Sequence, residues 1–214
     1  MPGFREYYFR KLIRFLQSRE YHRAKDLRAQ TNPQISIPEV LYLRWGIRTY
    51  RPQVLVEIGS FCGASTVLMA DQLRELGEGR IYAIDFFSQS SSSSGYSSQY
   101  HKTFDETMAP YLGWFEKIEG DSKKVPWNQP INFLFIDGDH SAGGVQADIT
   151  KYTPFLRPGG CVFLHDYVDV PEDNSMVKSA VDQTLLKNPV YRNLGVVRSL
   201  IAFEKLPPST PQHD

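Results

Sequence analysis

The segment Val54-Leu-Val-Glu-Ile-Gly-Ser-Phe-Cys-Gly-Ala-Ser-Thr66 decides the fold of this chain. It begins as an apolar run that ends in an acid, continues through two glycines four positions apart, and closes on a Ser-Thr pair typical of a helix start. In an α/β protein this order predicts a strand, a tight turn and a helix whose N-terminus faces a nucleotide-like ligand. Gly59 permits the sharp turn, and we expect Gly63 to leave room for a ligand against the backbone.

The spacing of the two glycines narrows the kind of ligand. The G-x-G-x-x-G pattern of dinucleotide-binding folds holds a pyrophosphate, but here Ser60 and Phe61 follow the first glycine, so the second glycine of that pattern is missing. Glu57 also lies where a carboxylate would repel a phosphate. The turn therefore favours a ligand with an adenosine end and a zwitterionic end but no phosphates, which describes S-adenosylmethionine (SAM).

Length, charge and cysteine content limit the class of protein. The 214 residues suffice for one domain with a full-sized core, and the equal numbers of acids and bases give no global charge that would favour nucleic acid. No apolar run approaches the roughly 20 residues that span a bilayer, and Arg10, Lys11 and Arg14 interrupt any signal-peptide core. Cys62 and Cys161 are more typical of reduced thiols than of a disulfide. The sequence therefore predicts a cytoplasmic protein.

The N-terminal part differs in composition from the rest. We expect residues 1–50 to form helices that pack on a core domain of residues 51–206, followed by a disordered tail at 207–214. The helical pattern over 4–29 has an aromatic and apolar side and an excess of Lys and Arg. Such a helix either packs on its own domain, which we favour, or lies on a membrane surface or a partner. Its aromatic side makes a homodimer plausible. A second helix is expected at 37–50.

Strand and helix patterns alternate through the core domain. Strands are expected at 54–58, 80–84, 115–119, 131–136 and 161–164, with a terminal antiparallel pair at 190–197 and 200–204. Helices are expected at 65–76, 103–112, 144–156 and 176–186. This alternation predicts an α/β fold with a doubly wound, mostly parallel, Rossmann-like sheet that ends in a C-terminal antiparallel strand pair.

The Ser-rich segment 88–100 interrupts the alternation and cannot form a core element. It follows the C-terminal end of the second expected strand, on the side where open α/β sheets bind ligands. The segment is therefore either a lid over the site, anchored by Tyr96, Tyr100 and His101, or a passive surface loop.

Acidic residues follow four of the expected strands: Glu57, Asp85, Asp137 and Asp166. Any one of them could cap a helix or turn, but the carboxyl ends of parallel strands meet around one crevice, where ligands bind. Asp85 can accept both hydroxyls of a ribose there, as an acid does in nicotinamide enzymes. Asp121 either meets an adenine amino group or caps a turn.

Five segments together resemble a class I SAM-dependent methyltransferase: EIGSFCGAST (57–66), IDFF (84–87), EGDS (119–122), FLFIDGDHSAGGVQADI (133–149) and LRPGGCVFLHDY (156–167). The resemblance extends from about residue 36 to 205. The glycine turn is similar to that of the cation-dependent O-methyltransferases. The IDGDH and LHDY motifs resemble more closely a bacterial branch that includes macrolide-sugar and rhamnosyl O-methyltransferases and proteins related to cephalosporin biosynthesis.

The resemblance implies a cofactor site and a metal site. The expected SAM contacts are Glu57 near the charged amino-acid end, Ser65 as a donor from the helix start, and Gly59, Ser60, Gly63, Asp85, Asp121 and Asp137. Asp137 and Asp166 are implied ligands of a divalent metal, with Mg²⁺ the expected cation. A third protein ligand is either Asp139 or His165, of which His165 is the residue we assign.

His140 lies three residues after Asp137, where the resemblance implies a general base. A neutral imidazole can take the proton of a hydroxyl as its oxygen attacks the sulfonium methyl. In the other interpretation, His140 caps the following helix or hydrogen-bonds to Asp139.

The sequence therefore predicts an enzyme that transfers a methyl group from SAM to a hydroxyl of a sugar or other small natural product, with metal assistance. One alternative is a nicotinamide-dependent oxidoreductase, against which the missing middle glycine and the absence of a Tyr-x-x-x-Lys pair count. The other is a SAM-binding module without catalytic activity. The expected partner is a small hydroxylated acceptor, and no motif specifies its identity.

Overall fold

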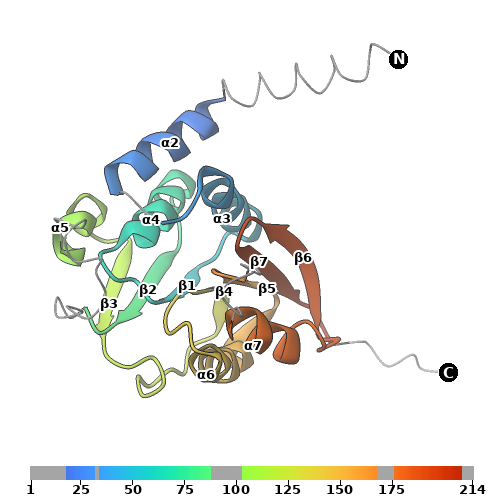
Figure 1. The fold of residues 1–214 in the computed structure, drawn as a ribbon. Helices are drawn as coiled ribbons and strands as arrows, with labels where there is room; N and C mark the ends of the chain where they lie inside the picture. Colours follow the sequence, from blue (N-terminus) through green and yellow to red (C-terminus); the bar gives the residue numbers. More distant parts are fainter. Residues whose placement is uncertain (1–17, 32–33, 88–102, 168–175, 209–214) are drawn as a thin grey trace, which may run out of the picture.

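The computed structural model describes residues 18–31, 34–87, 103–167 and 176–208 (Figure 1). The helices are α2 (Arg19–Thr31), α3 (Ile37–Tyr50), α4 (Ala64–Leu76), α5 (Phe104–Met108), α6 (Ala142–Tyr152) and α7 (Met176–Thr184), with 3₁₀ turns η1 (Ala109–Tyr111) and η2 (Thr153–Phe155). The strands are β1 (Val54–Ile58), β2 (Arg80–Asp85), β3 (Phe115–Glu119), β4 (Ile131–Ile136), β5 (Leu156–Leu164), β6 (Tyr191–Val197) and β7 (Leu200–Lys205). None of these described helices is both long and apolar enough to span a membrane.

The seven strands form one sheet in the order β3-β2-β1-β4-β5-β7-β6. Strands β1 to β5 are parallel, and β7 runs antiparallel to both β5 and β6. The predicted doubly wound sheet with a C-terminal antiparallel pair is therefore confirmed. Backbone hydrogen bonds continue just past the strand ends, from Asp137 N to Ile58 O and from His165 N to Ile136 O. The turns that follow β1, β4 and β5 consequently lie side by side.

Both faces of the sheet are covered by helices, α3 and α4 on one face and α6 and α7 on the other (Figure 1). Strand β4 contributes side chains to both cores: Phe133 packs with the α3–α4 side, where it stacks on Phe163 at 4.8 Å between ring centroids, while Leu134 packs with the α6–α7 side. Burial of one such side chain contributes about 1.5–3 kcal/mol. A strand buried on both faces needs the continuous apolar run that predicted it.

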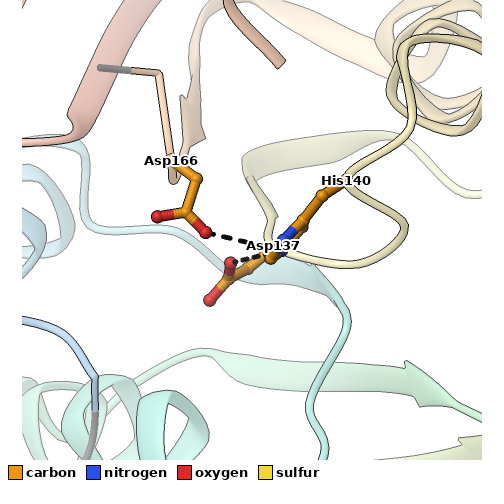
Figure 2. A group of neighbouring side chains, drawn as sticks. All are labelled: Asp137, His140 and Asp166. Carbon is orange, nitrogen blue, oxygen red and sulfur yellow. Dashed lines mark ion pairs between the residues drawn. The ribbon is translucent and has the colours of Figure 1, made fainter. Parts of the chain in front are cut away.

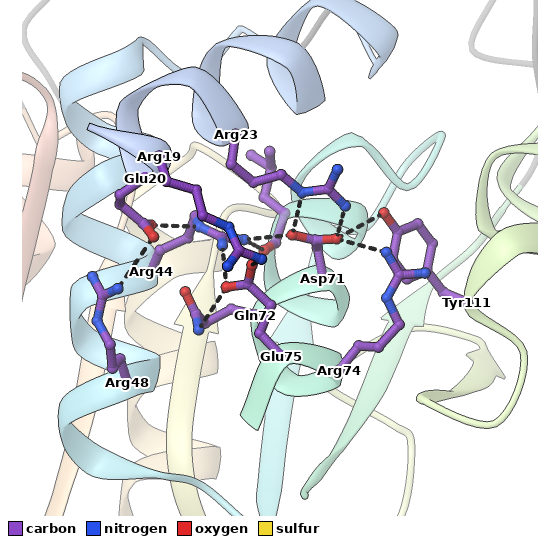
Figure 3. A network of polar contacts seen from close by, with 11 residues as sticks. Arg19, Glu20, Arg23, Arg44, Arg48, Asp71, Gln72, Arg74, Glu75 and Tyr111 are labelled. Carbon is purple, nitrogen blue, oxygen red and sulfur yellow. Dashed lines mark hydrogen bonds and ion pairs between the residues drawn. The ribbon is translucent and has the colours of Figure 1, made fainter. Parts of the chain in front are cut away.

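A buried ionic network attaches α2 and α3 to α4 (Figure 3). The fully buried Arg44 of α3 contacts Asp71 at 2.9 Å and Glu75 at 2.8 Å on α4, and Glu20 at 2.8 Å on α2. Asp71 also pairs with Arg23 of α2. Burial by itself would raise the pKa of Asp71, but the hydrogen bonds and charges of Arg23 and Arg44 lower it below its ordinary value. This network fixes α2 and thereby the start of α3 relative to the sheet.

The boundaries of two elements differ clearly from the sequence prediction. The helix expected at 144–156 begins earlier, because Ser141 caps it by accepting from Gly144 N at 3.0 Å. It also ends earlier, since Pro154 lies in the 3₁₀ turn that follows Tyr152. The strand expected at 161–164 starts instead at Leu156, which pairs with Ile131 ahead of a register shift. The expected features at 4–17, 88–100 and 209–214 lie outside the described residues.

Candidate active site

A cavity of about 690 Å³ opens at the carboxyl ends of the parallel strands. This is the edge where open α/β sheets bind ligands, and the volume is in the range of small-molecule sites. Its lining comes from the turns after β1, β2, β3, β4 and β5 and from the link between α2 and α3. The predicted site residues in this lining are Gly59, Ser60, Ser65, Asp85, Asp121, Asp137, His140, His165 and Asp166.

The two glycines of the first turn have different roles. Gly59 has a φ of 86°, and a Cβ at this position would collide with the backbone carbonyl of Asp137. It lets the turn after β1 touch the turn after β4. Gly63 does not line the cavity, and a Cβ there would meet Phe104 at 3.1 Å and Met108 at 3.2 Å. In the structure this glycine therefore faces α5, and its expected part in making room for a ligand stays a prediction.

Glu57 organises the first turn from beneath. The side chain is fully buried and lies outside the cavity lining, so the structure places it beneath the turn, and its expected contact with a ligand stays a prediction. It accepts hydrogen bonds from Ser60 at 2.9 Å, Ser65 at 2.5 Å and Thr66 at 2.6 Å. Burial raises its pKa to about 7, and these hydroxyls partly offset that rise. Ser65 Oγ donates its one hydrogen bond to Glu57. It can therefore accept a hydrogen bond from a ligand but cannot donate one, whereas the sequence predicted a donor.

Asp85 joins the turns after β1 and β2. One carboxylate oxygen accepts from Phe61 N at 2.9 Å and the other from Phe87 N at 2.8 Å. Each oxygen has a second lone pair, and the residue lines the cavity. The carboxylate can therefore shape both turns and still accept ligand hydroxyls. Asp121 also lines the cavity, and its Oδ1 accepts from Lys123 N at 2.9 Å, as in the capping alternative.

Asp137, His140 and Asp166 converge at one side of the cavity (Figure 2). Each offers one ligand atom, and these atoms all lie within 4.8 Å of one another. His140 Nε2 is 3.7 Å from Asp137 Oδ1 and 3.5 Å from Asp166 Oδ2. A hydrogen bond donated to Asp137 and the charges of both acids raise the pKa of His140, against the effect of burial. Asp166 has a φ of 58°, a strained value for a residue with a side chain.

The sequence left two other roles open for His140, as a cap of the following helix or as a hydrogen-bond partner of Asp139, and other residues make these contacts. Ser141 caps α6 through its side chain. Asp139 accepts from Ser141 N at 3.0 Å and lies 3.5 Å from Lys123 Nζ. Those two contacts, the backbone hydrogen bond foremost, lower the pKa of Asp139. Asp139 therefore fixes the loop before α6, while His140 faces Asp137 and Asp166.

His165 lies behind the two acids with a side chain only 7% exposed. Its Nδ1 is 3.3 Å from Asp137 Oδ1 and 3.3 Å from Asp166 Oδ1. Its Nε2 is 3.3 Å from Ser199 Oγ. Burial would lower the pKa of this imidazole, but the hydrogen bonds that it donates to the two acids, together with their charges, raise it to about 10. Both ring nitrogens face acceptors, so the geometry opposes the assignment of His165 as a metal ligand.

Several cavity residues were not predicted from the sequence. Gln34 and Ile35 reach the cavity from the link before α3, and Phe61 and Phe86 lie at its rim with exposed rings. Phe61 and Phe86 lie in or beside segments already assigned to ligand binding, so their positions were a usable signal. Nothing local in the sequence marks Gln34.

Residues 56–167 match a family model described as a methyltransferase domain. The match covers more than half of the chain and includes the turns that carry Asp137, His140 and Asp166. The chain belongs to this methyltransferase domain family. By family and fold it is a class I SAM-dependent methyltransferase, which confirms the predicted enzyme class and sets the oxidoreductase alternative aside.

Solved structures share the fold of this methyltransferase at low sequence identity. The O-methyltransferase TomG from Streptomyces achromogenes, involved in tomaymycin synthesis and in complex with SAM, has 15% identity and a TM-score of 0.60, over 91% of this chain and 95% of that one. An O-methyltransferase from Bacillus cereus in complex with SAH has 18% identity and a TM-score of 0.59, over 88% and 91%. The methyltransferase MycE from the mycinamycin biosynthetic pathway, in complex with Mg, SAH and mycinamycin VI, has 18% identity and a TM-score of 0.61, over 86% of this chain but 54% of MycE.

Proposed function

We propose that this methyltransferase moves the methyl group of SAM to a hydroxyl oxygen of a small molecule, with a divalent cation, expected to be Mg²⁺, bound at Asp137 and Asp166. The observation that carries the proposal is the convergence of Asp137, His140 and Asp166 within the same cavity as Asp85 and the glycine turn. In this proposal residues 51–206 form the SAM-binding domain and residues 1–50 supply the helices beside it.

The charge of the cavity supports a cationic methyl donor. Five Asp and one Lys line it, which favours a ligand with ammonium and sulfonium groups over one with phosphates. We assign the ribose hydroxyls to Asp85 and the adenine to the side of Asp121. Ser60 and Ser65 can accept from the donor's ammonium group, because their own protons are directed to Glu57. SAM supplies a methyl group that is electrophilic because it is bonded to a sulfonium.

The donor set supports a hard cation at the acceptor end. Two carboxylates are oxygen ligands of the kind that Mg²⁺ prefers, and they belong to the one cluster of potential ligands found among the described residues. A cation there supplies Lewis acidity, which makes the proton of a nearby hydroxyl easier to remove. We assign His140 Nε2, when neutral, as the group that accepts this proton. The remaining catalysis is positioning of the acceptor oxygen.

We propose a sugar hydroxyl as the acceptor on the basis of two sequence motifs. These are the IDGDH and LHDY motifs, which resemble macrolide-sugar and rhamnosyl O-methyltransferases. The structural neighbour MycE was solved with Mg, SAH and mycinamycin VI. The ligands that we propose for this chain are of the same kinds: a divalent cation, a methyl donor and a small-molecule acceptor.

The test incubates the full chain with isotope-labelled SAM, Mg²⁺ and a panel of glycosylated macrolides, deoxysugar glycosides and catechols, with products identified by mass spectrometry. We expect label on an oxygen and loss of turnover with chelator. Asp137→Asn should abolish turnover, while Glu116→Gln, an exposed acid outside the cavity lining, should retain most of it. Label on nitrogen or carbon would contradict O-methylation. SAM binding without turnover across the panel would support a non-catalytic module.

A further inference from the structure

A second buried carboxylate lies behind the acidic cluster. Glu39, in the first turn of α3, is only 3% exposed. One of its oxygens accepts from Ser36 N at 2.7 Å, which is the ordinary cap of a helix start. The other accepts from both the backbone N and the Oγ of Ser199, at 2.8 and 2.5 Å. Capping of α3 needs only the first contact, so the pair with Ser199 calls for another explanation.

Ser199 connects this carboxylate to His165. The residue lies in the turn between β6 and β7, and its hydroxyl donates to Glu39, so a lone pair of Oγ faces His165 Nε2 at 3.3 Å. Glu39 Oε1 is itself 3.7 Å from Nε2. The same turn is bonded to the segment after β5, because Tyr167 N donates to Ser199 O at 2.8 Å. The imidazole is thus held from the side opposite the cavity.

The far end of the ring then faces the two acids. Nδ1 lies 3.3 Å from the Oδ1 atom of both Asp137 and Asp166. A donor placed between two carboxylates offsets their repulsion and fixes one oxygen of each. Outer partners of this kind orient metal ligands, and their removal typically costs about 10–100-fold in metal affinity.

We propose that Glu39 and Ser199 are positioning residues of the metal site, which hold His165 so that its Nδ1 fixes Asp137 and Asp166 in place for a cation. The proposal rests on the proposed function in one respect, the cation at those two acids. It assigns to α3 and to the β6–β7 turn a part in metal binding, although both lie outside the cavity lining.

The first test measures binding of Mg²⁺ by calorimetry and of Mn²⁺ by electron paramagnetic resonance, with the full chain and no acceptor. Ser199→Ala removes the hydroxyl but keeps the backbone N–H that Glu39 accepts. Because Ser199 acts through His165 and does not touch the ligands directly, we expect binding of both cations to weaken by up to about tenfold, the lower end of the range for a direct outer partner, with an unchanged SAM dissociation constant. Ser199→Thr, which restores a hydroxyl, should restore the wild-type affinity.

A second pair of variants separates this role from the stability of α3. Glu39→Gln removes the carboxylate and should weaken cation binding in the same range. Glu20→Gln is the matched control, because Glu20 also holds α3, through Arg44 and Arg48, but lies in the separate ionic network. It should leave the cation affinity unchanged.

The outcomes distinguish this inference from the proposed function. If the wild type binds Mn²⁺, Asp137→Asn does not, and both Ser199→Ala and Glu39→Gln bind as the wild type does, then the positioning role is wrong and the metal site stands. A wild type that binds neither cation overturns both. Parallel loss of cation affinity, SAM affinity and thermal stability in Ser199→Ala and Glu39→Gln would mean a general structural role and would overturn the positioning role.

Discussion

Asp85 accepts the backbone N–H of Phe61 at 2.9 Å, across the gap between the turns that follow β1 and β2. Its other oxygen accepts from Phe87 N at 2.8 Å. Phe61 and Phe87 both have positive φ angles, 44° and 49°, which residues other than glycine rarely adopt. The carboxylate therefore holds two strained turns in the shape that borders the cavity.

Replacement of Asp85 should weaken donor binding. In Asp85→Asn an amide nitrogen faces one of the two N–H groups, so one turn loses its partner and the ribose loses a charged acceptor. Hydrogen bonds to charged groups contribute about 1.5–3 kcal/mol, so we expect the SAM dissociation constant to rise by about tenfold or more. Calorimetric titration with SAM measures this. An unchanged dissociation constant would remove Asp85 from the donor site.

Gly59 should tolerate no side chain. In Gly59→Ala the new Cβ would collide with the Asp137 carbonyl, and the positive φ adds about 1–2 kcal/mol of strain. We expect a lower free energy of unfolding in urea and loss of cation binding, because Asp137 must move. Gly143→Ala is the control, since a Cβ there meets nothing within 4 Å in α6 and Ala favours helix. If the two variants were equally stable, Gly59 would not lie as close to the Asp137 carbonyl as the structure has it.

Local patterns in the sequence predicted much of this fold, and the reason is visible in β4. Its residues Ile131–Ile136 are apolar on both faces because helices cover both, so the run itself signals a buried parallel strand. The start of β5 was missed because Pro158 and Gly159 are typical of turns, whereas pairing with β4 extends the strand back to Leu156. Tertiary pairing decides such a boundary.

The candidate site shows a similar division. Asp85, Asp137 and Asp166 were predicted because topology alone brings the carboxyl ends of parallel strands together. The direction of the Glu57 side chain, toward hydroxyls beneath the turn, has no counterpart in the local pattern. The partnership of Glu39 with Ser199 joins positions 160 residues apart, and only the folded chain reveals it.

Glu57 should make stability depend on pH. Its native pKa of about 7 lies above the ordinary value of 4.5, so the native state holds the proton more tightly than the unfolded state. Below pH 4.5 both states are protonated, and as the pH rises to about 7 the wild type loses stability, by at most about 3 kcal/mol. Glu57→Gln stays neutral, so its free energy of unfolding relative to the wild type should rise across this window and then level off.

The comparison uses urea unfolding of both proteins between pH 4.5 and 8, so that other titrating groups largely cancel. Glu116→Gln, at an exposed position of β3, is the matched control and should show a flat difference. If the difference in free energy of unfolding between Glu57→Gln and the wild type also did not change with pH, burial would not disfavour the charged form of Glu57.

Substitution of Asp71 should lower the free energy of unfolding more than substitution of most other residues outside the cavity. In Asp71→Ala, Arg44 keeps Glu20 and Glu75 but loses its buried partner on α4 (Figure 3). Removal of one member of a buried ion pair costs about 3–5 kcal/mol, which denaturant unfolding would detect. Arg48→Ala breaks only a half-exposed contact with Glu20 and should cost about 1 kcal/mol or less. Similar losses in the two variants would argue against a special role for the buried pair.

His140 is either a base or a third metal ligand, and the two roles predict different results for His140→Ala. As a base, its loss should lower kcat by about 10²–10⁴-fold and leave the affinities for SAM and Mn²⁺ unchanged. As a ligand, its loss should weaken Mn²⁺ binding, as Asp137→Asn does. We expect the first result, because the His140 side chain is 57% exposed and Nε2 lies 3.5 Å or more from both acids, open to an acceptor hydroxyl. Wild-type turnover in His140→Ala would exclude both roles.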